Sequence, residues 1–81
     1  MRYFFNIAGA VYDPDNEGVE LSSIDAARIE AVKHASELMR DRPHIVWQGE
    51  EFRVEVTDGD RLVLFTVIVF GVDAPSAPRR R

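Results

Sequence analysis

The chain contains no cysteine, which excludes disulfide bonds, zinc–thiolate sites, iron–sulfur clusters and cysteine nucleophiles. It also lacks any run of about 18 apolar residues, so no membrane-spanning helix is expected. The N-terminal residues Met1 to Asn6 reach a polar side chain at once, and we therefore expect no secretory signal peptide. Together these absences favour a cytoplasmic protein.

The chain is also short, with 81 residues, which allows one domain. We expect residues 1–72 to form that domain and residues 73–81 to be a flexible tail rich in Pro, Ala and Arg. Domains this small have thin cores and often gain stability from disulfides, metals or association. Because no disulfide can form and no metal site is evident, we expect a homo-oligomer, most simply a dimer.

Positive charge is scarce outside the C-terminus. The net charge is −4, with 14 acidic residues against 10 Lys and Arg, and the basic residues include Arg79, Arg80 and Arg81. The acidic remainder would be repelled by a nucleic-acid backbone, so nucleic acid is not an expected partner. The three terminal arginines are the one feature that would favour a nucleic-acid accessory role.

The hydrophobic pattern of the N-terminal part predicts strands. Alternation over residues 2–8 places Tyr3, Phe5 and Ile7 on one face of a first strand. Residues 11–13 are expected to begin a second, antiparallel strand, which the turn-forming residues 14–18 interrupt. Extended structure is expected to resume over residues 19–21.

A helix is the strongest secondary-structure prediction. Ser22 precedes Asp25 by three residues, the spacing of a capping box, and Pro43 ends the helix near Asp41 or Arg42. At 100° per residue one apolar stripe forms, which we expect to pack on a sheet. The stripe contains Ile24, Ala27, Ala31, Val32, Ala35, Leu38 and Met39.

Two further strands follow the helix. The connector 44–51 is expected to close one end of the core through Ile45, Val46 and Trp47. Residues 52–57 alternate well, a turn is expected at residues 58–60, and a nearly continuous apolar run covers residues 62–70. The pattern predicts an α+β fold, in ββαββ order, with an antiparallel sheet of about four strands and one helix on one face.

The last strand carries apolar side chains on both faces, but a single helix covers only one. If residues 58–60 form the loop, Val56 pairs with Leu62 and Val54 with Leu64. Val63, Phe65, Val67 and Val69 then lie on the uncovered face and form an interaction surface. A two-residue loop would reverse the faces. Cover within the monomer, by Trp47 and the connector or by Phe4 and Tyr12, is the alternative.

No catalytic, cofactor or metal site is expected. Residues 13–18 resemble the start of a calcium loop, but position 12 is Ile24, which cannot ligate, so a turn held by local hydrogen bonds is favoured. His34 and His44 lack metal-ligand spacing. Arg28 is expected to extend its charged group to the rim of the apolar stripe, or to pair with Glu17 or Glu20. Ser22 and Ser23 are expected to cap the helix, Ser36 to lie on its surface and Ser76 to lie in the tail. No nucleophile motif occurs.

The order of these parts resembles a family of small bacterial domains of unknown function. The resemblance covers residues 2–70 and is carried by the segments Arg2-Tyr3-Phe4-Phe5, 15–21, 25–31 and 52–56. More distantly, the layout is similar to HicB-type antitoxin domains, and that resemblance implies binding to a small toxin. The chain lacks the C-terminal DNA-binding segment of those antitoxins.

These observations predict a non-catalytic interaction module that self-associates through a sheet face. An acidic regulator that binds a basic protein is the alternative, and its acidic groups would include Asp13, Asp15, Glu17, Glu20, Glu50 and Glu51. A nucleic-acid accessory protein that uses the arginine tail is the third hypothesis.

Overall fold

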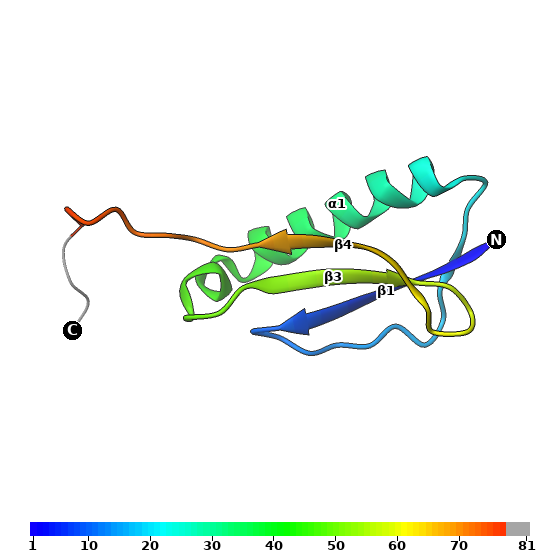
Figure 1. Cartoon of the computed structure of the whole chain (residues 1–81), viewed down its shortest axis with the longest axis horizontal. Coiled ribbons are helices and arrows are strands. Elements are labelled where there is room, and N and C mark those ends of the chain that lie inside the picture. Colours follow the sequence, from blue (N-terminus) through cyan, green and yellow to red (C-terminus); the bar gives the residue numbers. More distant parts are fainter. Residues whose placement is uncertain (78–81) are drawn as a thin grey trace.

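The fold is one antiparallel sheet with a long helix across one face (Figure 1). It is described here from a computed structural model over residues 1–77. The sheet has four strands in the order β2-β1-β3-β4, which confirms the predicted α+β class and ββαββ order. The elements are β1 (Arg2–Gly9), β2 (Val19–Glu20), α1 (Ile24–Asp41), the 3-10 helix η1 (Pro43–Trp47), β3 (Phe52–Thr57) and β4 (Val63–Val69).

Strand β3 is the centre of the sheet and of the core. It pairs with β1 on one side and β4 on the other, both antiparallel. Phe52, Val54 and Val56 of β3 are completely buried and face α1. The predicted alternation in residues 52–57 is therefore confirmed, and Tyr3 and Phe5 of β1 extend the same core as expected.

Helix α1 packs on the sheet through small side chains. Ala27, Ala31 and Ala35 are buried, and their size lets the helix axis approach the sheet closely. The predicted stripe is too wide, because Ile24 and Val32 are exposed at its margin. The helix ends at Asp41 as predicted, immediately before Pro43.

The N-terminal cap of α1 is Ser23 rather than Ser22. The backbone N–H of Ala26 donates a hydrogen bond of 3.1 Å to Oγ of Ser23, whose backbone is extended. The helix thus begins one residue later than the Ser22–Asp25 spacing predicts. Ile45 of η1 is buried and closes one end of the core as expected, whereas Trp47 is half exposed.

Strand β2 is shorter than the pattern predicts. Residues 11–13 form only an isolated antiparallel bridge, between Asp13 and Ile7, and regular pairing is limited to Val19–Glu20. None of the described helices is long and apolar enough to span a membrane.

Gly9 provides a test of the close contact between β1 and β3. Gly9 and Gly49 both have positive φ, but a Cβ at Gly9 would lie 2.3 Å from the carbonyl oxygen of Glu51, whereas a Cβ at Gly49 meets nothing within 4 Å. We expect Gly49→Ala to lower the free energy of unfolding by about 1–2 kcal/mol, the cost of the left-handed backbone. Gly9→Ala should cost clearly more, measured by urea unfolding. Equal effects would contradict a steric role for the Glu51 carbonyl.

Candidate interaction surface

Strand β4 is an exposed sheet edge without charge. Its sequence is Val-Leu-Phe-Thr-Val-Ile-Val, whereas β1 carries Arg2, β2 carries Glu20 and β3 carries Arg53 and Glu55. It pairs with β3 on one side, and among residues 1–77 no strand pairs with its other side. The unpaired backbone N–H and C=O groups of such an edge can add a further strand.

The structure corrects the predicted register of the β3–β4 hairpin. Val56 pairs with Phe65 rather than with Leu62, and Val54 pairs with Val67 rather than with Leu64. Opposite residues point to the same face of a sheet. Phe65, Val67 and Val69 therefore lie on the α1 side, partly buried against the core, and not on the uncovered face as predicted.

A β-bulge separates Val63 from the other three predicted contact residues. Val63 pairs with Thr57 and Phe65 pairs with Val56, so Leu64 is an extra residue between the two pairs. The alternation reverses there, and Val63 follows Thr57 onto the face away from α1. The four residues predicted to share one uncovered face are thus divided between both faces, and whether they make an intermolecular contact stays a prediction.

The hairpin loop is longer than residues 58–60 by two residues, which together with the bulge at Leu64 explains the error in register. Oδ1 of Asp58 accepts hydrogen bonds from the backbone N–H of Asp60 (2.8 Å) and of Leu62 (3.0 Å). Arg61 adopts a positive φ of 66°, a conformation in which non-glycine residues are uncommon. The predicted turn at Asp58 is confirmed, but nothing in the apolar run after it marks the two additional loop residues or the bulge.

The side of α1 next to β4 is partly apolar and exposed. The guanidinium of Arg28 lies over the Phe65 ring, 6.0 Å from its centroid, and pairs with Asp25 at 2.8 Å. The predicted pairing of Arg28 with Glu17 or Glu20 is therefore wrong. Val32 lies one turn after Arg28 on the same side and is 53% exposed.

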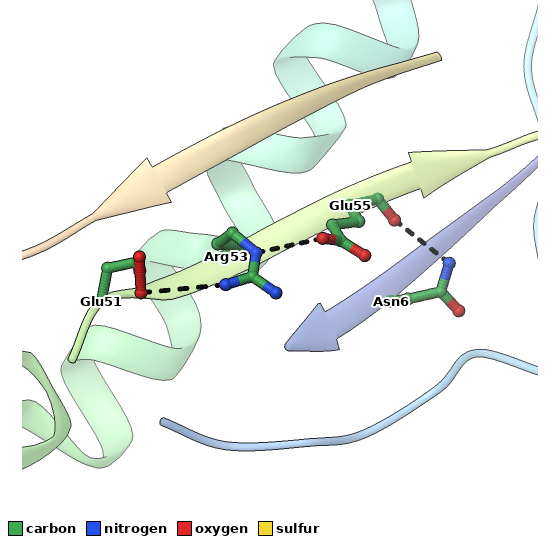
Figure 2. A network of polar contacts seen from close by, with 4 residues as sticks. All are labelled: Asn6, Glu51, Arg53 and Glu55. Atoms are coloured by element: carbon green, nitrogen blue, oxygen red, sulfur yellow. Dashed lines mark hydrogen bonds and ion pairs between the residues drawn. The ribbon is translucent and has the colours of Figure 1, made fainter. Parts of the chain in front are cut away.

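The face of the sheet opposite α1 is polar at its centre. Figure 2 shows Arg53 between the carboxylates of Glu51 and Glu55. Nε of Arg53 lies 3.0 Å from Oε2 of Glu55, and Nη1 lies 3.8 Å from Oε2 of Glu51. Nδ2 of Asn6 donates to the Glu55 carbonyl oxygen at 3.1 Å. This network makes the centre of the uncovered face polar. The exposed apolar side chains next to β4 therefore lie at the edge of the sheet and not at its centre.

The segment resembling a calcium loop is organised by its own hydrogen bonds. Oδ1 of Asp15 accepts from the backbone N–H of Glu17 and of Gly18, each at 3.0 Å, and Oδ2 accepts from the N–H of Phe5 at 3.0 Å. The expected turn held by local hydrogen bonds is confirmed for Asp15. Within residues 1–77, no group of three His, Asp or Glu side chains is arranged to hold a metal ion.

The hydrogen bonds to Asp15 also change its acidity. Partial burial alone would raise the pKa of Asp15. Hydrogen bonds from the N–H groups of Gly18, Phe5 and Glu17, together with the nearby His34, outweigh burial and lower this pKa below its ordinary value. Asp15 therefore contributes to stability when it is ionised, and it does so by fixing the loop beside β1.

The remaining polar residues singled out in the sequence have structural contacts. The His34 ring stacks on Phe5 with centroids 4.8 Å apart, and its Nε2 lies 3.5 Å from Glu30. Oγ of Ser36 donates to the Val32 carbonyl oxygen at 2.8 Å. His44 is exposed at the start of η1. Arg79, Arg80 and Arg81 lie outside the described residues, so the predicted role of the arginine tail stays a prediction.

We expect Asp15→Asn to lower the free energy of unfolding at pH 7 by about 1–2 kcal/mol, because it removes the charge of a partly exposed, hydrogen-bonded carboxylate. The folded pKa lies below the unfolded one, so this stabilisation is complete above the unfolded pKa of about 4 and is lost as the pH falls through the folded pKa. Urea unfolding at several pH values, with exposed Asp13→Asn as control, measures the difference. A deficit that is unchanged at low pH would contradict this role.

Comparison with known proteins identifies a family. A family model described as "Domain of unknown function (DUF6894)" matches residues 2–71, which includes every strand and helix described above. No curated protein and no solved structure matches the chain. Because the match covers most of the chain, the protein belongs to the DUF6894 family of domains of unknown function.

Proposed function

We propose that the protein is a non-catalytic interaction module that associates with itself through the β4 edge. The observation that carries the proposal is the composition of β4, which is the sheet's long open edge and has no charged side chain. Natural sheets usually protect such edges with a charge, a proline or a very short strand. Here the one edge that is kept short is β2, with two residues.

The surroundings of β4 support a protein contact. Val63 and Ile68 on the strand and Val32 on α1 are each more than half exposed to solvent. Val63 and Ile68 lie on the face away from α1 and Val32 lies on the helix side, so exposed apolar side chains border the open edge on both faces of the sheet, and such groups suit a protein contact. Because both copies of the chain are acidic, an uncharged strand is also the surface on which they would repel each other least.

An Ile68→Lys variant tests the role of the edge. The Ile68 side chain is 55% exposed and lies opposite Arg53, on the face away from the core, so the fold should tolerate the change. A charge in the contact should raise the dimer dissociation constant by at least about tenfold, equivalent to about 1.4 kcal/mol. Sedimentation velocity over a wide concentration range measures this constant.

Asn16→Lys is the matched control. Asn16 is exposed in the loop beside β1, and its substitution introduces the same charge away from β4. It should leave the dissociation constant unchanged. A wild-type chain that remains monomeric at every concentration would contradict self-association.

A second candidate function, an acidic regulator that binds a basic protein, is favoured by a hollow at the end of β4. This hollow has a volume of about 660 Å³, and Trp47, Ile68 and Phe70 line it together with Glu50, Glu51 and Asp73. Aromatic faces beside carboxylates suit a lysine or arginine side chain. Of the acidic groups first considered, Glu50 and Glu51 line this hollow, and because Glu51 is also paired with Arg53, Glu50 is the better placed of the two.

This second candidate predicts binding of a short arginine-rich peptide, measured by fluorescence anisotropy. Glu50→Gln should weaken the binding about three- to tenfold, and added salt should weaken it further, because the attraction is between partly exposed charges. Asp60→Gln, in the exposed hairpin loop, is the control. Binding that is insensitive both to salt and to Glu50→Gln would exclude this candidate.

A further inference from the structure

We infer that the partner on the β4 edge is a second copy of this chain, paired antiparallel and related by a two-fold axis that passes through Val67. This inference rests on the proposed function and specifies its geometry. It follows from the position of the bulge, the alternation of side chains along β4 and the exposed residues of α1.

The β4 edge is the one open edge of regular length in the described sheet. At the opposite edge, β2 pairs with the start of β1, and the loop after β1 covers the rest through the Ile7–Asp13 bridge and the bond from Phe5 to Asp15. A strand added at β4 would instead meet a continuous backbone edge. Pairing of β4 with its own copy is therefore the simplest closed, symmetric contact.

The bulge sets the register. Regular pairing in β4 runs from Phe65 to Val69, because Leu64 interrupts the ladder before it. Two antiparallel copies of a five-residue segment overlap fully when its middle residue, Val67, lies opposite itself. Phe65 then lies opposite Val69 of the other copy, and Thr66 lies opposite Ile68.

In this register, apolar side chains on the helix side of one copy lie opposite apolar side chains on the helix side of the other. Opposite residues share a face, so Phe65, Val67 and Val69 of both copies continue the apolar layer beneath the two helices. Thr66 and Ile68 meet on the other face. A shift by one residue relative to the partner strand would place the partner's helix on the opposite side of the sheet and expose this apolar row.

The helices provide a second layer of contact. Figure 1 shows α1 and β4 running in the same direction, and Arg28 lies over Phe65. Two strand residues rise about 6.6 Å, and about four helix residues cover the same distance, so the position of α1 beside Val67 is near Val32. The two-fold axis thus brings the exposed Val32 of one copy towards Val32 of the other, where the two side chains would be buried on association.

Cysteine cross-linking tests the register, since the natural chain has no cysteine that could react. Thr66→Cys and Ile68→Cys are prepared separately, then mixed and oxidised. Residues directly opposite in an antiparallel pair have Cα atoms about 4.5–5.5 Å apart, within the range that a disulfide spans. We expect a disulfide-linked heterodimer of the two variants and little cross-linking of either variant alone.

Three results would overturn the inference. Efficient cross-linking of Thr66→Cys alone would place the axis at Thr66. Absence of any cross-link while the wild-type chain sediments as a dimer would exclude edge pairing but leave self-association standing. A monomeric wild-type chain would contradict both the proposed function and this inference.

A helix variant gives an independent readout without oxidation. Val32→Glu should raise the dimer dissociation constant at least about tenfold, because it places a charge from each copy near the two-fold axis. Lys33→Glu, the adjacent exposed position on another side of α1, is the control and should have little effect. Equal effects of the two variants would contradict the helix contact.

Discussion

The packing of three alanines of α1 against the central strand β3 is the contact on which the rest of the structure depends. Ala27, Ala31 and Ala35 are buried against a sheet whose middle strand contributes three completely buried side chains. Burial of each large apolar side chain contributes about 1.5–3 kcal/mol, so this layer provides most of the stability available to so small a chain. Because one helix covers the centre of the sheet, the outer side of β4 is left partly uncovered.

That geometry also explains where polar side chains are found. On the face away from α1, Arg53 forms ion pairs with two carboxylates and Asn6 donates to a carbonyl of β3, so the centre of that face is polar and needs no further cover. At the edge, β4 has apolar side chains in both directions and no charge to discourage a further strand. Association at such an edge is the means by which we propose that this small domain gains stability.

The sequence predicted the fold better than it predicted which residues of β4 lie on the uncovered face. Alternation in β1 and β3, the alanine-rich stripe of α1 and the stop at Pro43 are local signals, and the structure confirms each. The faces of β4 were predicted incorrectly because they reverse at one extra residue, the bulged Leu64, whereas the two additional loop residues after Asp58 shift the register and leave the faces unchanged. An apolar run with no glycine or proline carries no signal for a bulge, and a change of one residue reverses the faces.

The sequence by itself determined the class of the fold, the order of its elements and the core residues of β1, of β3 and of the alanine stripe in α1, because period and composition act over short stretches of chain. Only the tertiary structure decided that Phe65, Val67 and Val69 lie beneath the helix, that Arg28 pairs with Asp25 and covers Phe65, and that Val32 is exposed beside the open edge. These outcomes depend on register and on the placement of α1 over the sheet. Both are set by contacts between residues distant in the sequence, which no local pattern records.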